Sequence, residues 1–202
     1  MEEIRSYLQY EKSGRVYENF FGLGDLRADD LDALTLDEEK FIEFTDALIE
    51  VSPAEIQVLT IAGGQNGCYG HRENVVYVSR HISRPMQIRT TLHEMTHAIL
   101  HPWPGGVKPK EELPRAVRET EAEGVAYLVC MNYGLDVGAY SLDYIQSWIR
   151  HLTPDEAEWS LALAERTAKR IVAAIDAELE KQSLEHSSGV RAKARTSEEY
   201  RD

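Results

Sequence analysis

The sequence has few cysteines and no long apolar run, and both absences narrow the class of protein. Cys68 and Cys130 are the only cysteines among its 202 residues, and they lie far apart. This pattern does not indicate a disulfide framework, so we expect reduced thiols and a cytoplasmic location. No apolar run approaches the roughly 20 residues that span a bilayer, and the acidic start lacks the positive charge of a signal peptide. We therefore expect no membrane partner.

Basic residues are also scarce. The chain has 22 Lys+Arg against 35 Asp+Glu, a formal net charge of -13. Because phosphate contacts need clustered lysine and arginine, this balance argues against nucleic-acid binding by this chain alone. The glycine cluster 63–67 is not followed by Gly-Lys-Ser/Thr, which excludes a phosphate loop there. The 43% hydrophobic content is nevertheless sufficient for a core.

Apolar spacing, capping residues and turn residues predict the order of the elements. Helices are expected at about 37–51, from Pro85 to about His101, from Pro114 to Tyr133, from Ser141 to about His151, and from 154 to about Lys181. Two β-branched segments, 56–61 and 74–79, predict strands that run antiparallel, with 74–79 at the edge of the sheet beside a cleft. The expected fold class is α+β, with a small antiparallel sheet packed on several helices.

The composition divides the chain into three parts. Residues 1–35 are expected to form an N-terminal arm, 36–182 the folded domain, and 183–202 a disordered tail with few apolar residues. The segment 102–112, rich in proline, glycine and lysine, is expected to be a mobile loop between two helices.

The helix that begins near Pro85 carries an H-E-x-x-H motif from His93 to His97. Residues at i and i+4 lie one turn apart on one face of a helix, so both imidazoles can bind a single ion. Glu94 is rotated off this pair and can hold a water molecule beside the metal. The motif predicts one zinc ion per chain, with Glu94 as the catalytic residue.

Catalytic zinc needs a third protein ligand, and the helix after Pro114 offers Glu119, Glu121 and Glu123. Glu121 shares its stripe with three apolar residues, and a carboxylate on an apolar stripe is costly to bury unless it is paired or metal-bound. We therefore predict Glu121 as the ligand and Glu123 as the alternative, with Glu119 as a solvated surface residue.

Other polar residues near these motifs receive lesser roles. His101 lies eight residues after His93, about 12 Å along a straight helix, which is too far for one ion. It is more simply a partner of the helix C-terminus or a wall of the cleft. Tyr140 and Tyr144 could donate a hydrogen bond to developing oxyanion charge, or could simply pack under the last helix.

The H-E-x-x-H motif, followed by the segment 118–130 and by Gly134-Leu135-Asp136, resembles the ImmA/IrrE family of metallo-endopeptidases. It is most similar to the C-terminal domain of ArdC-type plasmid antirestriction proteins. The resemblance covers about 50–180 and implies a gluzincin-like fold, with metal on His93, His97 and Glu121 and with Glu94 as general base. Glu123 stands where the wider family often has asparagine.

The resemblance implies hydrolysis of a peptide bond in a protein or peptide substrate, of which a transcriptional repressor is one candidate. The alternative function is a binding or antirestriction module in which the metal is structural and the acidic surface docks a regulator or a restriction enzyme. Glu94 distinguishes the two, because hydrolysis needs a general base and a structural site does not.

Overall fold

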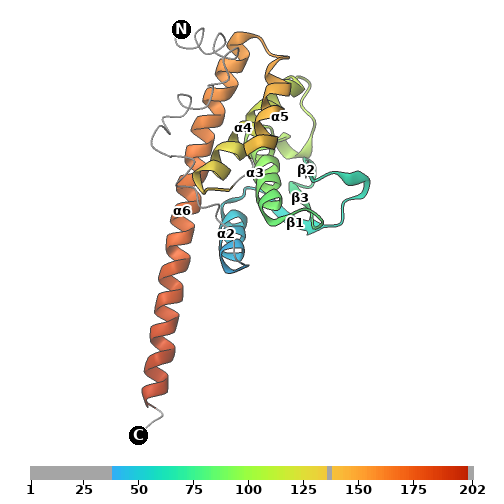
Figure 1. Cartoon of the computed structure of the whole chain (residues 1–202). Helices are drawn as coiled ribbons and strands as arrows, with labels where there is room; N and C mark the ends of the chain where they lie inside the picture. Colours follow the sequence, from blue (N-terminus) through green and yellow to red (C-terminus); the bar gives the residue numbers. More distant parts are fainter. Residues whose placement is uncertain (1–37, 136–137, 200–202) are drawn as a thin grey trace.

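The computed structural model describes the backbone of residues 38–135 and 138–199, with side chains for 40–135 and 144–186. The expected arm 1–35 lies outside the described residues. In chain order the elements are α2 (Glu38–Val51), β1 (Glu55–Leu59), the 3-10 turn η1 (Ala62–Gly64), β2 (Gly67–Gly70), β3 (Val75–Ser79), α3 (Arg84–Leu100), the 3-10 turn η2 (Pro104–Gly106), α4 (Arg115–Asn132), α5 (Gly138–Ile149) and α6 (Pro154–Glu199) (Figure 1).

Most helices begin and end where local chemistry predicts. Helix α3 has Pro85 in its first turn, and α4 is followed by Gly134 in the left-handed region at φ 64°. At the start of α6, the Thr153 N–H donates to Glu156 Oε2 at 2.8 Å and the Glu156 N–H donates to Thr153 Oγ1 at 3.3 Å, a reciprocal capping box. Helix α5 begins at Gly138 and therefore includes Ser141, which was expected to cap it.

Helix α6 is longer than the sequence predicts. The helical backbone continues to Glu199, past the expected end near Lys181 and through most of the expected tail 183–202. It extends well beyond the other elements (Figure 1), and Leu184 is 65% exposed. A scarcity of apolar residues therefore marks where packing ends, whereas an established helix can add one hydrogen bond per residue beyond that point.

The sheet has the order β1-β3-β2, so β3 is its central strand. Strand β3 runs parallel to β1, with Glu55 opposite Val75, and antiparallel to β2, with Cys68 opposite Tyr77. Two predictions were therefore wrong: the sheet is mixed, and 74–79 is not its edge. The chain leaves β1, forms β2, and returns to pair between them. Strand β2, Gly-Cys-Tyr-Gly, has no β-branched residue, so local sequence gives it no strand signal.

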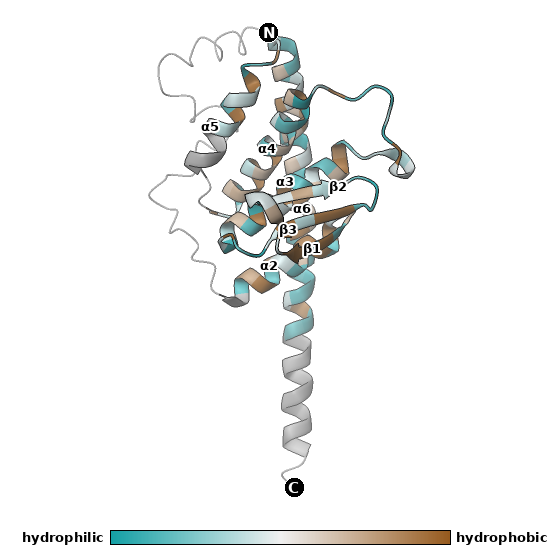
Figure 2. Cartoon of the chain, turned by 90° about the vertical axis from the view of Figure 1, so that its right-hand side faces the viewer, coloured by the Kyte–Doolittle hydropathy of each residue, from teal (hydrophilic) through white to brown (hydrophobic). Residues whose placement is uncertain are grey.

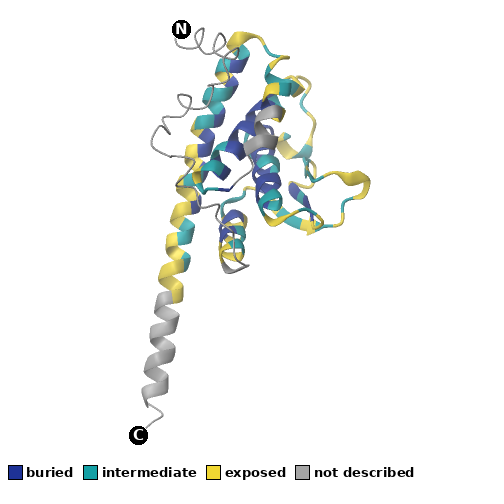
Figure 3. Cartoon of the chain, in the orientation of Figure 1, coloured by how far each residue is buried: buried dark blue, intermediate teal, exposed yellow. Residues whose placement is uncertain are grey.

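The sheet packs against α3, and α4 lies among α3, α5 and α6, while α2 packs on α6. Hydrophobic residues are concentrated on β1 and β3 in Figure 2, and the burial colouring of Figure 3 marks α3 and α4 as the centre of the fold. The main core comes from α2, α3, α4 and α6; its fully buried members include Leu48, Leu92, Met95, Val125 and Ile175. Within the described ranges, no helix is long and apolar enough to cross a membrane.

Candidate metal centre

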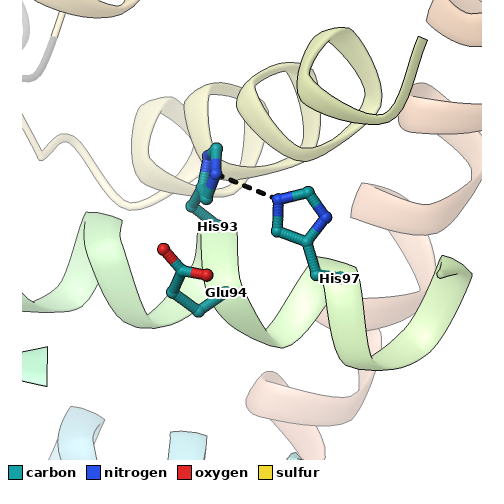
Figure 4. A group of neighbouring side chains, drawn as sticks. All are labelled: His93, Glu94 and His97. Atoms are coloured by element: carbon teal, nitrogen blue, oxygen red, sulfur yellow. Dashed lines mark hydrogen bonds between the residues drawn. The ribbon is translucent and has the colours of Figure 1, made fainter. Parts of the chain in front are cut away.

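Helix α3 places His93 and His97 on one face, one turn apart. Their Nε2 atoms lie 3.2 Å from each other (Figure 4). His93, Glu94 and His97 each offer a ligand atom within 4.8 Å of the others. The H-E-x-x-H motif thus brings two imidazole nitrogens and a carboxylate together, as the helical spacing predicts.

Helix α4 brings Glu119 to the same two nitrogens. Its Oε2 atom is 3.5 Å from His93 Nε2 and 4.0 Å from His97 Nε2. Its Oε1 atom accepts a hydrogen bond of 3.3 Å from Arg115 Nε, which leaves Oε2 facing the imidazoles. The Glu119 side chain is only 18% exposed, so it is not the solvated surface residue that the sequence suggested.

Glu121, the ligand expected from the sequence, is not brought to the histidine pair. It is fully buried, and its Oε2 atom lies 2.7 Å from His101 Nε2. A carboxylate on the buried stripe was expected to need a partner, and Glu121 has one. That partner is the imidazole of His101, one turn beyond the H-E-x-x-H motif, and not the metal site. His101, 7% exposed, also contacts His97, with 2.9 Å between the two Nδ1 atoms.

Glu123, the alternative ligand, lies behind His93. Its Oε1 atom is 3.1 Å from His93 Nδ1, the nitrogen that points away from His97. Its Oε2 atom accepts a hydrogen bond from the guanidinium of Arg89, which is 5% exposed. Glu123 therefore orients His93 from the rear, and Arg89 balances its charge. Sequence reasoning missed Arg89, since nothing local distinguishes a buried arginine from a surface one.

Glu94 lies under strand β2. Burial raises the pKa of its carboxyl to about 7, against the opposing charge of His93. Strand β2 approaches α3 closely here: a Cβ on Gly67 would lie 2.5 Å from Thr90 Cγ2 and 3.3 Å from Glu94 Cγ. Glycine at this position allows the strand to cover the carboxylate, and a carboxyl with a pKa near 7 can both accept and release a proton at neutral pH.

The imidazole pair differs in charge in the absence of a metal. Burial opposes a charge on His93, but hydrogen bonds with Glu119 and Glu123 outweigh it and raise its pKa to about 10. Burial, together with the charges of His93 and His101, lowers the pKa of His97 to about 2. Although burial opposes its ionisation, the two motif histidines lower the pKa of Glu119 to about 2. The site therefore holds one positive charge between anionic carboxylates.

This donor set fits a divalent metal ion. In a tetrahedral zinc site with bonds of about 2.0–2.1 Å, two donor atoms are separated by about 3.3 Å. The separations of His93 Nε2 from His97 Nε2, 3.2 Å, and from Glu119 Oε2, 3.5 Å, are close to this value, whereas the third separation, 4.0 Å between His97 Nε2 and Glu119 Oε2, is longer. Two imidazoles and a carboxylate leave a coordination position for water or substrate, as in catalytic rather than structural sites.

The donors open into a cavity of about 440 Å³ between strand β2 and helix α4. Tyr144 from α5 lines it, is 40% exposed, and packs edge-on against Trp148. Tyr140 lies in the same helix, but its side chain is outside the described residues. Of the two tyrosines expected near the reaction, Tyr144 thus has a place at the cavity wall.

The fold and the site define an α+β protein with a candidate metal centre built on an H-E-x-x-H helix, and the segment that holds this site is similar to a known family. Residues 54–135, from β1 through α4, match the family model of the IrrE N-terminal-like domain, Peptidase_M78. This match supports the resemblance to ImmA/IrrE proteins and a metallopeptidase-type assignment for the segment that holds the site.

An uncharacterized protein of Bacillus anthracis is 32% identical to this chain over 91 residues. The aligned segment is 45% of this chain and 15% of that protein, so the chain spans a small part of its relative. No solved structure matches the chain.

Proposed function

We propose that this protein is a zinc-dependent endopeptidase in which His93, His97 and Glu119 hold the metal and Glu94 is the general base. The observation that carries the proposal is the convergence of three donor atoms at ligand separations, with the Glu94 carboxylate beside them in one cavity. Two histidines and a carboxylate are a donor set that favours zinc, since imidazole binds it well and the open position suits catalysis.

The residues of the chain have separate tasks in peptide hydrolysis. When bound, zinc supplies Lewis acidity that polarises a carbonyl oxygen and makes water more acidic. Glu94 accepts the proton of the attacking water and delivers it to the leaving amine, a role that its position beside the histidine pair in the cavity allows. Tyr144, at the cavity wall, is the candidate donor to the oxyanion.

Strand β2 is the edge of the sheet that faces the cavity, which Gly67, Cys68 and Tyr69 line. An extended peptide can add to such an edge through main-chain hydrogen bonds, which gives affinity with little dependence on sequence. A protein substrate is therefore favoured over a small molecule. The resemblance to ImmA/IrrE and ArdC-type proteins supports a repressor-type regulator of a mobile element or stress response as the substrate class.

A proteome-derived peptide library, analysed by mass spectrometry after incubation with the zinc-loaded protein, tests this function. The wild-type protein should produce new peptide termini. Glu94→Gln should retain zinc and reduce cleavage by about 10²–10⁴-fold, because glutamine has nearly the same shape but cannot accept the proton. Glu50→Gln, at an exposed position on α2, is the control for the change in charge.

Absence of cleavage by the zinc-loaded wild-type protein, or equal cleavage by Glu94→Gln, would contradict the peptidase function. The alternative, a metal-stabilised module that docks a regulator or restriction enzyme, would then account for the site.

A further inference from the structure

A chain of three side chains runs from the candidate metal centre into the core between α3 and α4. His97 Nδ1 lies 2.9 Å from His101 Nδ1, and His101 Nε2 lies 2.7 Å from Glu121 Oε2. The side chains of His101 and Glu121 are 2% and 0% exposed. This chain lies behind His97, on the side away from His93.

Among the described residues, the contact with His101 is the polar contact that Glu121 makes. Its second oxygen, Oε1, is buried and has no hydrogen-bond partner among the described residues. A buried carboxylate with an unpartnered oxygen destabilises the folded state, because the lost hydration of that oxygen is not replaced. An apolar residue at this place in the core would avoid that cost, so the contact with His101 calls for a functional explanation.

The positions of the protons follow from the contacts. A metal on Nε2 of His97 leaves the proton of that imidazole on Nδ1, which must donate. The acceptor at 2.9 Å is His101 Nδ1, so the proton of His101 must be on Nε2. There it donates to Glu121 Oε2 at 2.7 Å. With a metal on His97 Nε2, this is the arrangement of protons that satisfies both contacts, and in it the lone pair of His97 Nε2 faces Glu119 and His93.

We propose that His101 and Glu121 are positioning residues that fix the tautomer and the ring orientation of His97, with Nε2 free to bind the metal. The inference rests on the metal-binding part of the proposed function and does not depend on peptide cleavage. The two motif histidines are thus held differently: a carboxylate lies directly against His93, whereas a second imidazole stands between His97 and its carboxylate.

The tautomer of His101 can be measured directly. In the zinc-loaded protein, ¹⁵N NMR of the histidine side chains should show His101 protonated on Nε2 and unprotonated on Nδ1. A structural role in packing does not require either tautomer. A proton on Nδ1 of His101 in the zinc-loaded protein would overturn the proposal.

Zinc affinity, measured by competition with a chromophoric chelator, tests the positioning by mutation. His101→Leu keeps much of the volume but removes the acceptor, and should weaken zinc binding by about 10–100-fold. His101→Asn should lose less zinc affinity than His101→Leu, because the asparagine Oδ1 occupies the place of His101 Nδ1 and can accept a hydrogen bond from His97. Glu121→Gln should also lose less than His101→Leu, since its amide oxygen can still accept. Ile99→Ala, in the same turn of α3, is the control for local destabilisation and should leave zinc affinity unchanged.

If His101→Leu does not fold, His101→Asn and His101→Gln decide the question. Glutamine places its amide near the position of Nε2 rather than Nδ1, so zinc should bind more weakly to His101→Gln than to His101→Asn. Equal zinc affinities in His101→Asn and His101→Gln, or a wild-type zinc affinity in His101→Leu, would overturn the positioning role of His101. Neither result would affect the proposed peptidase function. Zinc binding without peptide cleavage would remove only the peptidase function, whereas a wild-type protein that binds no zinc would overturn both.

Discussion

At the scale of single residues, three carboxylates at alternate positions of α4 have three different partners. Glu119 faces the Nε2 atoms of His93 and His97, while Glu123 lies behind His93 and Glu121 contacts His101. The same side-chain chemistry thus offers a metal ligand at one position and orienting contacts at two others. What distinguishes them is which imidazole nitrogen each one reaches.

Replacing these carboxylates by their amides should therefore have unequal effects on metal binding. Glu119→Gln replaces a charged donor by a weak neutral one and should reduce zinc affinity more than Glu121→Gln, which keeps an acceptor for His101. Zinc competition assays on both variants, with Glu50→Gln as the surface control, measure the difference. A larger loss in Glu121→Gln than in Glu119→Gln would restore Glu121 as the ligand.

The burial of Glu94 predicts a dependence of stability on pH in the metal-free protein. Its pKa of about 7 in the folded state lies above the ordinary value of 4.5, so the folded state holds this proton more tightly than the unfolded state. The contribution of Glu94 to the free energy of unfolding should be highest below pH 4.5, should fall as pH rises towards 7, and should then level off. The buried His97, whose pKa is lowered, contributes with the opposite sign as pH falls below 6.5, so the Glu94 contribution is the difference between the wild-type protein and Glu94→Gln, about 3 kcal/mol.

Glu94→Gln cannot ionise, so it should gain stability relative to the wild-type protein between pH 5 and pH 8. Urea unfolding of both proteins at the two pH values, with a chelator present, measures this gain. Parallel pH profiles would show that the buried carboxyl does not carry the effect.

The H-E-x-x-H part of the site was predictable because its geometry is local: helical spacing alone places His93 and His97 together. The third carboxylate was not predictable in this way. The sequence argument correctly placed Glu121 on the buried stripe, but it treated Glu119 as a solvated surface residue. It could not show which face of α4 meets α3, because the rotation of one helix against another depends on packing across the whole core.

At the scale of elements, the contact between strand β2 and helix α3 shapes the cavity. A Cβ at position 67 would lie 2.5 Å from Thr90 Cγ2 and 2.7 Å from the Tyr77 carbonyl oxygen. The backbone carbonyl cannot move without disturbing the β2–β3 pairing, so the strand must shift if the glycine is replaced. This close approach places β2 over Glu94.

Gly67→Ala should therefore reduce the free energy of unfolding by about 1–3 kcal/mol, the usual range for an overpacked site. Peptide cleavage should fall as well, because the displaced strand lines the cavity. Urea denaturation and the peptide-library assay measure the two effects. Thr90→Ser in the Gly67→Ala background removes one of the two clashing groups and should restore part of the stability; no restoration would indicate that Thr90 does not limit the approach.

The helices were predictable from sequence to a greater extent than the sheet. Proline, glycine and capping residues mark both ends of α3 and α4 and the start of α6 locally, and the apolar period marks their buried faces. Strand direction and order depend on pairing between segments far apart in the chain. Two β-branched segments alone suggest a hairpin, whereas the insertion of β2 makes β1 and β3 parallel neighbours.

At the scale of the whole molecule, the candidate metal centre lies where α3, α4 and the sheet meet. Two of its donors come from α3 and one from α4, and the segment between these helices, which includes η2, contributes no donor. The site therefore connects two elements that are otherwise held together by the hydrophobic core and by buried ion pairs such as that between Arg89 and Glu123. A metal bound there would act as a cross-link between the two halves of the core.

Zinc should consequently raise the thermal stability of the whole chain. A ligand that binds only the folded state adds about 2.7 kcal/mol at a free concentration of one hundred times its dissociation constant. The melting temperature of the wild-type protein should rise with added zinc and fall when a chelator is in excess. Glu119→Gln, which lacks the donor from α4, should show a much smaller rise in melting temperature. Glu94→Gln should respond like the wild-type protein, because Glu94 is not a ligand. Equal shifts in wild-type protein and Glu119→Gln would mean that zinc is bound without joining α3 to α4, and the site would then have to be sought on α3 alone.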